Sequence, residues 1–338
     1  VDELAPAGWH TCARAGDVTF CWGQRLTGAQ AEPPMTPNPE RTRPRAIGNL
    51  DARRLAAGGP HTCVLKTNGR VACFGHSMFN ELGRPNADDV ACTAPFFYDY
   101  HGNPAHTCSG TLVEAAVNVP NAVAIAAGEL HSCLLAGGRV HCWGTNLGGQ
   151  RGRPGAQAGE LNPQLVVTDP TLLTPLEQVV AIASSGAKHT CALRAGAVSV
   201  WCWGINDRGQ LGADPAMLPQ RVHAAAVPGL TGITSLGASD GVSCAVKSDG
   251  SAFCWGRNEA GQLGDGTTTD SFAPVQVKGP GGAGTLDKVT AIAPGVRHVC
   301  ALRSDATVWC WGKNDRGQLG DGTTTDSAFP VKVVGLPP

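Results

Sequence analysis

Histidines and cysteines recur along this chain at a spacing that could hold either metal ions or disulfide bonds. The clearest example is His298-Val299-Cys300, followed ten residues later by Cys310. Alternate residues of a strand point to the same face, so His298 and Cys300, with a cysteine on the facing strand, would make a plausible set of zinc ligands. The two cysteines could equally form a disulfide across a hairpin, where facing Cα atoms lie roughly 4.5–5.5 Å apart.

Twelve of the fourteen cysteines form six such pairs, separated by 9 to 11 residues. The pairs are Cys12/Cys21, Cys63/Cys73, Cys133/Cys142, Cys191/Cys202, Cys244/Cys254 and Cys300/Cys310. The fifth pair keeps both cysteines although Val242 replaces the histidine, whereas a metal site should lose its ligands together. We therefore predict six disulfides and no metal, with zinc as the alternative.

The remaining cysteines, Cys92 and Cys108, lie in the longest insertion of the chain and are predicted to form a seventh disulfide. An even number of cysteines, each with a place in a pair, is typical of proteins from oxidising compartments. The sequence thus predicts an extracytoplasmic protein that is secreted, periplasmic or exposed on the cell surface. Its start at Val1 is expected for a processed or trimmed N-terminus.

Other residues with chemical potential have simpler structural interpretations. Two Asp-Gly-Thr-Thr-Thr-Asp segments, 265–270 and 321–326, could bind calcium, but such side chains more commonly bond their own turn. A histidine recurs five times, each time two residues before the first cysteine of a pair. We expect each histidine to bond turn backbone within its own repeat unit (its blade, in the propeller predicted below), because a single active site would need such a residue only once. These histidines are His10, His61, His131, His189 and His298. Nucleophile-elbow, zinc-protease and phosphate-loop motifs do not occur, so we predict neither an enzyme nor a cofactor.

The cysteine pairs belong to a repeat of 51 to 70 residues that occurs six times. Its last copy holds four strand-length runs, at 289–293, 299–303, 307–311 and 329–334, separated by turn residues. No stretch shows a helical period, and 45 glycines and 24 prolines suit an array of tight turns. We predict an all-β fold, a six-bladed β-propeller of four-stranded blades with within-blade disulfides. It should be one domain over 1–338, with blades at about 1–50, 51–120, 121–178, 179–230, 231–286 and 287–338.

The repeat resembles the regulator of chromosome condensation (alpha-tubulin suppressor-like) repeat family. The resemblance rests on Trp-Gly-x-Asn at 143–146, 203–206, 255–258 and 311–314, and on Gly-Gln-Leu-Gly-Asp-Gly-Thr-Thr-Thr-Asp at 261–270 and 317–326. It implies protein binding by a face of the propeller, as in exchange factors for a small nuclear GTPase and in a secreted bacterial β-lactamase inhibitor. The best-known members have seven blades, whereas six copies are counted in this chain.

The charge of the chain argues against several classes of partner. The formal net charge is −1, and lysine and arginine are dispersed, which predicts no binding of nucleic acid. No run of eighteen apolar residues occurs, which predicts no membrane insertion.

Three long insertions, at residues 24–44, 76–110 and 147–175, are predicted to fall in the turn between the third and fourth strands of blades 1–3. Insertions on one face of a repeat array often mark its binding face. The second insertion carries an aromatic cluster that could anchor a partner, consisting of Phe96, Phe97, Tyr98, Tyr100 and His101. In the alternative interpretation, Phe96 and Phe97 pack the loop against the propeller.

These observations predict a secreted or surface-exposed, non-enzymatic recognition protein that binds another protein or peptide through the long loops of blades 1–3. One alternative is a carbohydrate-binding or adhesion module, with Tyr98, Tyr100 and Trp9 as stacking platforms. Another is a structural subunit of a surface assembly, and an enzyme of unknown reaction ranks last.

Overall fold

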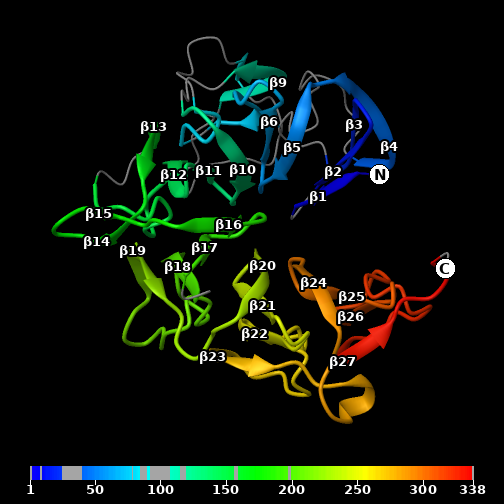
Figure 1. The fold of residues 1–338 in the computed structure, drawn as a ribbon. Coiled ribbons are helices and arrows are strands. Elements are labelled where there is room, and N and C mark those ends of the chain that lie inside the picture. Colours follow the sequence, from blue (N-terminus) through cyan, green and yellow to red (C-terminus); the bar gives the residue numbers. More distant parts are fainter. Residues whose placement is uncertain are drawn as a thin grey trace. The chain divides into compact units, whose positions relative to one another are not determined.

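The computed structural model describes residues 2–7, 10–24, 40–77, 79–83, 90–91, 107–114, 119–155, 159–196 and 199–336. The chain forms two compact units: unit 1 is 1–177 with 185–187, and unit 2 is 178–184 with 188–338. In the described ranges the regular structure is β-strand throughout, apart from the short 3-10 helix η2 (Pro280–Gly282). Each unit contains three sheets of four or five strands, and unit 1 also contains a two-stranded hairpin (Figure 1). The strands follow the order of the chain in every four-stranded sheet.

Unit 1 holds the first three sheets, which we call blades 1 to 3. Blade 1 consists of β1 (Glu3–Pro6), β2 (His10–Ala15), β3 (Val18–Gln24) and β4 (Glu40–Asn49). Blade 2 consists of β5 (Ala52–Ala57), β6 (His61–Lys66), β7 (Val71–His76) and β9 (Thr107–Glu114), with the short strand β8 (Val90–Ala91) added beside β9. Blade 3 consists of β10 (Ala122–Ala127), β11 (His131–Ala136), β12 (Arg139–Gly144) and β13 (Glu160–Leu165). A separate hairpin, β14 (Val167–Asp169) and β15 (Thr174–Pro175), follows blade 3.

Unit 2 holds blades 4 to 6. Blade 4 consists of β16 (Val179–Ala183), β17 (His189–Arg194), β18 (Ser199–Ile205) and β19 (Gln220–Ala226). Blade 5 consists of β20 (Ile233–Ser239), β21 (Val242–Lys247), β22 (Ala252–Gly256) and β23 (Ser271–Gln276). Blade 6 consists of β24 (Val289–Pro294), β25 (His298–Arg303), β26 (Val308–Gly312) and β27 (Ser327–Lys332).

The fold class predicted from the sequence is confirmed, an all-β propeller fold with six blades of four antiparallel strands. Blades 1 and 6 are each built from four consecutive strands, β1–β4 and β24–β27, so neither described terminal sheet borrows a strand from the other end of the chain. The prediction of one domain over 1–338 stays a prediction.

The cysteines of each pair face one another between the second and third strands of a blade. Cys63 lies opposite Cys73 in the β6–β7 register, and the other five pairs are placed in the same way. The Cα atoms of the six pairs are 4.1–4.2 Å apart, close to the spacing of a non-hydrogen-bonded antiparallel pair.

All twelve of these cysteines form disulfides, with the pairing predicted from the sequence. The bonds are Cys12–Cys21 in blade 1, Cys63–Cys73 in blade 2, Cys133–Cys142 in blade 3, Cys191–Cys202 in blade 4, Cys244–Cys254 in blade 5 and Cys300–Cys310 in blade 6. The six within-blade bonds are therefore confirmed, and they leave no thiolate among these twelve residues to bind zinc.

Every fourth strand contains a bulge opposite the residue that follows the second cysteine. In β23, the residues Phe272, Ala273 and Pro274 face the single residue Trp255. Pro44, Pro163 and Pro330 occupy the same position in β4, β13 and β27. A proline in a bulge removes no hydrogen bond from the ladder, and on an edge strand it opposes pairing with a further strand.

The core lies between neighbouring sheets, as expected for blades that cannot bury their own faces. In unit 2, Trp255 of blade 5 is fully buried and its Nε1 donates to the carbonyl oxygen of Gln210 in blade 4, at 2.9 Å. Trp311 makes the same bond to Gln262, also at 2.9 Å. In unit 1, Trp143 donates to the carbonyl oxygen of Glu81. These bonds show that the tryptophans of the repeat pack blades together.

The third predicted insertion is shorter than the sequence indicated. Residues 160–165 are the fourth strand of blade 3, and residues 167–175 form the hairpin that comes after it. The turn between the third and fourth strands therefore ends before Glu160, and placing all of 147–175 in it was wrong. The strand was missed because its sequence, Glu-Leu-Asn-Pro-Gln-Leu, combines a proline with the lack of any β-branched residue, and the bulge accommodates the proline.

Candidate functional site

Each loop between the third and fourth strands of blades 5 and 6 is organised around one asparagine. In blade 5, Nδ2 of Asn258 lies 3.1 Å and 3.0 Å from the carbonyl oxygens of Thr267 and Thr269. It also lies 3.0 Å from Oγ1 of Thr267 and 3.3 Å from Oδ1 of Asp265. Its Oδ1 accepts the N–H of Leu263 at 2.8 Å. One buried amide thus holds both ends of the loop.

Blade 6 repeats this arrangement around Asn314, whose Nδ2 lies 3.0–3.3 Å from oxygens of Asp321, Thr323 and Thr325. The oxygens that could have bound calcium therefore surround an amide nitrogen. Asp321 also accepts the backbone N–H of Thr323 at 3.0 Å, which confirms that these side chains bond their own turn. In the part of the chain that the structure describes, no group of three or more His, Cys, Asp or Glu side chains is placed to hold a metal ion.

Ion pairs connect the loops of blades 4 and 5. Arg208 of blade 4 lies 3.0 Å from Glu259 and 3.3 Å from Asp270, both in blade 5. Glu259 also pairs with Arg257 at 2.9 Å, and Arg257 with Asp240 at 3.0 Å. The hydrogen bond and charge of Arg257 lower the pKa of the Glu259 carboxyl group, so this carboxylate stays ionised at neutral pH. We call these five residues the blade 4–5 charge network.

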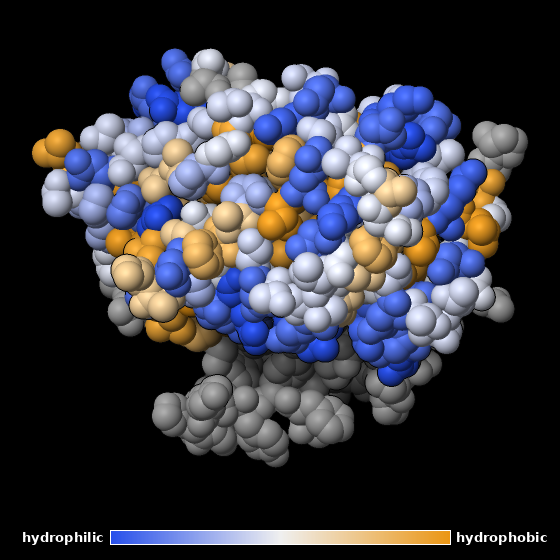
Figure 2. Space-filling model, turned by 90° about the horizontal axis from the view of Figure 1, so that it is seen from below, coloured by the Kyte–Doolittle hydropathy of each residue, from blue (hydrophilic) through white to orange (hydrophobic). Residues whose placement is uncertain are grey.

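Apolar side chains lie exposed on the same two loop regions. Phe272, at the start of β23, is 50% exposed, and Met217 in the β18–β19 loop is 86% exposed. Gly209 packs directly on Phe272, because a Cβ at Gly209 would lie 2.6 Å from the Cβ of Phe272. Figure 2 shows one face of the molecule, on which apolar side chains lie in small groups between hydrophilic ones. Interfaces between separately folded partners are about as apolar as the rest of a protein surface, so a mixed surface of this kind is compatible with one.

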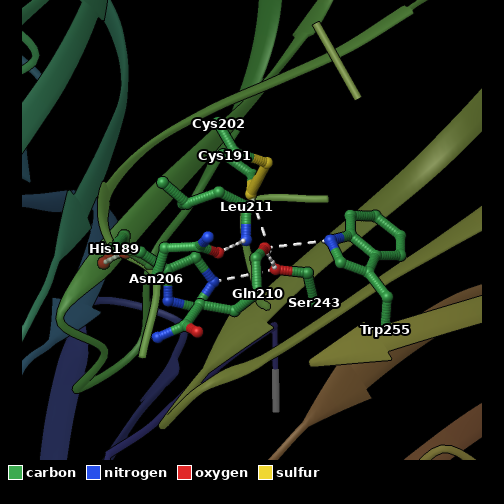
Figure 3. The surroundings of a disulfide bond; sticks show 9 residues. His189, Cys191, Cys202, Asn206, Gln210, Leu211, Ser243 and Trp255 are labelled. Carbon is green, nitrogen blue, oxygen red and sulfur yellow. Dashed lines mark hydrogen bonds between the residues drawn. A yellow bond between two sulfur atoms is a disulfide. The ribbon is translucent and has the colours of Figure 1, made fainter. Parts of the chain in front are cut away.

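Three of the five repeat histidines, His10, His61 and His189, take part in buried bonds between blades, and Figure 3 shows the bond of His189. In unit 2, Nε2 of His189 lies 2.8 Å from Oγ of Ser243 in blade 5. Ser243 donates its hydrogen to the carbonyl oxygen of Gln210 at 2.9 Å, the same oxygen that accepts Nε1–H of Trp255. Because the hydroxyl has one hydrogen, His189 must donate from Nε2, as a neutral ring. Burial lowers the pKa of His189 to about 4.

Unit 1 contains the same bonds, with His10 to Thr62 at 2.6 Å and His61 to Ser132 at 2.9 Å. Our expectation that each histidine bonds backbone within its own blade was wrong for these residues, because the ring points from the second strand to the next sheet. The glycine of the motif makes room for the ring, since a Cβ at Gly58 would lie 2.6 Å from Cε1 of His61. The hydrogen-bond partner of each of these histidines, which the sequence analysis did not identify, is the middle residue of the His-x-Cys motif (or of its counterpart Val-x-Cys) in the following blade. The sequence did carry this signal, because that residue is Ser or Thr in copies one to five.

The predicted binding cluster lies outside the described residues. Phe96, Phe97, Tyr98, Tyr100 and His101 all fall in the range 92–106, as does Cys92, and Trp9 is also outside the described ranges. The backbone of Cys108 belongs to β9, and its disulfide with Cys92 stays a prediction. The first two insertions lie at the strand connection that the sequence indicated, between β3 and β4 and between β7 and β9, but their last residues, 40–44 and 107–110, belong to the fourth strands β4 and β9.

The family model of the RCC1-like domain matches residues 18–338 of the sequence. The chain belongs to the RCC1-like domain family. The resemblance inferred from the Trp-Gly-x-Asn and Gly-Gln-Leu-Gly elements is thereby confirmed.

Several curated proteins share this RCC1-like sequence. The chain is 31% identical to the human E3 ubiquitin-protein ligase HERC2 over 285 residues, which is 83% of the chain and 5% of HERC2. It is 33% identical to the Arabidopsis thaliana ultraviolet-B receptor UVR8 over 213 residues, 62% of the chain and 45% of the receptor. It is 30% identical to the Bos taurus secretion-regulating guanine nucleotide exchange factor, over 84% of the chain and 60% of that factor. The chain thus spans between 5% and 60% of the length of these relatives.

Solved structures support the RCC1-like fold. Yeast RCC1 (Prp20), in a crystal structure with Kap60, matches 98% of this chain and 74% of its own length, with a TM-score of 0.76 at 21% identity. Human WBSCR16 has the same TM-score and identity over 99% of this chain and 83% of its own. A further structure of Prp20p from Saccharomyces cerevisiae was described together with its binding to Gsp1p and histones. At these identities the likeness shows the fold alone.

Proposed function

We propose that this RCC1-like chain is a non-enzymatic recognition protein that binds another protein or peptide through the loops between the third and fourth strands of its blades. We further propose that it acts outside the cytoplasm and that the long loops of blades 1–3 supply the main contacts. The binding of Kap60, Gsp1p and histones by yeast Prp20 supports protein binding as the kind of function to test first.

The observation that carries this proposal is the way the third-to-fourth strand loops are held. Asn258 and Asn314 fix the loops of blades 5 and 6 from inside, so their outer side chains are presented without a large ordering cost on binding. The blade 4–5 charge network adds fixed charges, and Phe272 and Met217 add apolar contacts. Binding residues gather on loops over a rigid scaffold, and the first two insertions extend this same strand connection.

The six disulfides support the proposed compartment. All twelve of their cysteines are at most 2% exposed apart from Cys300, which is partly buried, and each is bonded within its own hairpin. Structural disulfides persist in oxidising compartments and are rare in the cytosol. No helix in the described part of the chain is both long and apolar enough to cross a membrane.

The family to which the chain belongs is the basis for proposing that it has no catalytic activity. RCC1-like domains are generally non-catalytic, and the ligase in the name of HERC2 belongs to a protein of which this chain spans 5%. Three of the histidines that might have served as acids or bases, His10, His61 and His189, are committed to bonds between blades.

The proposed function can be tested by quantitative affinity capture from the source organism, with the folded, oxidised chain as bait. One bait variant truncates the aromatic cluster (Phe96→Ala, Phe97→Ala, Tyr98→Ala and Tyr100→Ala), and a second carries Arg208→Ala and Glu259→Ala in the blade 4–5 charge network. We expect a captured protein whose affinity, measured afterwards with the purified partner, falls at least tenfold with the aromatic variant. A matched control, Leu172→Ala in the β14–β15 hairpin, should leave this affinity unchanged.

Three results would count against the proposal. A partner that binds all variants equally would place the site elsewhere. Binding to a glycan array that disappears with the two tyrosines would favour the carbohydrate-binding alternative. Self-assembly of the purified chain into a lattice or filament would favour the structural subunit.

A further inference from the structure

Three hairpin turns between second and third strands have the same backbone hydrogen bonds. In blade 2, Lys66 N–H donates to the carbonyl oxygen of Arg70 at 2.8 Å, and Gly69 N–H donates to that of Lys66 at 3.0 Å. The turn of blade 5, 247–251, and the turn of blade 6, 303–307, repeat both bonds at 2.9–3.0 Å. The fourth residue of each turn has a positive φ, of 80° at Gly69, 82° at Gly250 and 62° at Ala306. The three turns are therefore directly comparable.

The third residue of each turn accepts a backbone hydrogen bond on its side-chain oxygen. Oδ1 of Asn68 accepts the N–H of Arg70 at 2.9 Å. Asp249 and Asp305 accept the equivalent bonds, at 2.9 Å and 3.1 Å. Bonds from Ser251 and Thr307 lower the pKa values of these two carboxyl groups. The same turn thus accommodates a carboxylate in blades 5 and 6 and an amide in blade 2.

The amide in blade 2 is followed by glycine, in an exposed position. Asn68 is exposed, and no atom lies within 4 Å of the place that a Cβ of Gly69 would occupy. A glycine at this position puts no side chain in the path of its own nitrogen toward the side-chain carbonyl carbon, and the reaction begins when the Gly69 N–H leaves its bond to the carbonyl oxygen of Lys66. The Arg70 N–H bonded to Oδ1 polarises that carbonyl toward attack.

From this arrangement we propose that Asn68 is a site of spontaneous deamidation, with water as the co-reactant. The nitrogen of Gly69 loses its proton to hydroxide and bonds to Cγ of Asn68. The bond from Cγ to the side-chain nitrogen breaks, and ammonia leaves. Water then opens the resulting cyclic imide at one of its two carbonyl carbons, which yields aspartate or isoaspartate. No oxidant or reductant takes part, and the chain gains one negative charge.

The turn discriminates between the two products. Aspartate at position 68 would reproduce Asp249 and Asp305, so the hairpin bonds of blade 2 can persist. Isoaspartate adds one carbon to the backbone and displaces Arg70 from the bond with Lys66. We therefore expect the aspartyl form to keep the stability of the original chain, and the isoaspartyl form to open the end of this hairpin.

The chain contains an internal control in Asp249-Gly250, which has the same turn and the same following glycine. A carboxylate is a much poorer electrophile than an amide, and the lowered pKa keeps Asp249 ionised at neutral pH. Asn121 is a second control, because it is exposed, has a φ of 61° and is followed by Ala122 in place of glycine.

The experiment is ageing of the folded, oxidised protein for several weeks at neutral and at mildly alkaline pH, followed by peptide mapping with electron-transfer fragmentation. We expect the peptide with Asn68 to gain about one dalton, faster at the higher pH, while Asp249 and Asn121 stay unchanged. Gly69→Ala should slow the reaction at least tenfold without unfolding the turn, since Ala306 shows that alanine fits there. Asn68→Asp should have the thermal midpoint of the unmodified chain.

Two outcomes would overturn the proposal. Asn68 could stay intact while a free peptide of the same sequence deamidates, which would show that the turn protects it. Alternatively, Asn68 and Asn121 could react at equal rates, which would show that the Asn-Gly turn confers no selectivity.

Discussion

Val242 and Val299 occupy, at the junction of blades 5 and 6, the two positions that His189 and Ser243 hold at the junction of blades 4 and 5. Val242 faces Gly256 as His189 faces Gly204, and Val299 faces Trp311 as Ser243 faces Trp255. Both valines are fully buried in one apolar cluster. The polar pair has therefore been replaced as a pair, because either partner alone would bury an unsatisfied polar group.

This relationship predicts the result of a double-mutant cycle. Val242→His alone should lower the free energy of unfolding by about 1–3 kcal/mol, because the buried ring would face Val299. Adding Val299→Ser should recover at least half of that loss, since the introduced hydroxyl could accept from the new histidine and donate to the carbonyl oxygen of Gln262, where Trp311 already donates. Denaturant unfolding of the four proteins gives the coupling energy. Simple additivity of the two single changes would show that these positions do not communicate.

Acid should destabilise the protein through the buried histidines. The pKa values of His10 and His189 are lowered by burial from 6.5 to about 4, so the unfolded chain binds more protons between these values. Stability is then fully present above about pH 6.5 and is lost as pH falls toward 4, by up to about 3 kcal/mol for each histidine. Thermal midpoints across this range would measure the loss. His189→Val should flatten the profile, and a wild-type midpoint that rises on acidification would contradict the assignment.

Removing the amide at the centre of a loop should loosen that loop. Asn258→Ala leaves the N–H of Leu263 and the surrounding oxygens without their common partner, which should cost about 2–3 kcal/mol. Hydrogen exchange should show faster exchange confined to 257–270. Asn314→Ala in blade 6 is the matched variant and should act on 313–326 alone. Equal loss of protection in both loops from either variant would contradict this account.

The disulfides give a prediction for both stability and mass. Replacing Cys244 and Cys254 together by alanine opens a bond between residues ten apart, which should cost about 2–3 kcal/mol in the chain-entropy model. Intact mass before and after reduction counts the bonds directly. Six bonds correspond to the described pairs, and a seventh would establish the predicted Cys92–Cys108 bond. Alkylation of any of the twelve paired cysteines without reduction would argue against the within-blade framework.

Much of the fold could be predicted because its determinants are local in sequence. Two cysteines 9 to 11 residues apart, with a turn between them, are placed to face one another across a hairpin, and all six such pairs do so. Cys12 and Cys21, Cys133 and Cys142, and Cys191 and Cys202 are bonded as their spacing predicts. The fourth strand of blade 3 was the exception, because Glu160–Leu165 has no β-branched residue. The run 329–334 of blade 6 has Pro330 in the same bulge but three valines, and it was predicted.

The sequence by itself determined the repeat, the number of blades, the disulfide pairs and the family, since each depends on residue types at fixed short spacing. Only the tertiary structure decided what the recurring side chains of the repeat bond to. His189 bonds Ser243, which lies 54 residues further along the chain, and Arg208 pairs with Glu259 of the following blade. Both contacts form because one sheet packs on the next. Such partners belong to neighbouring sheets. The sequence shows which positions recur in each repeat, but only the packing of one sheet on the next shows that the histidine of one blade faces the serine or threonine of the following blade.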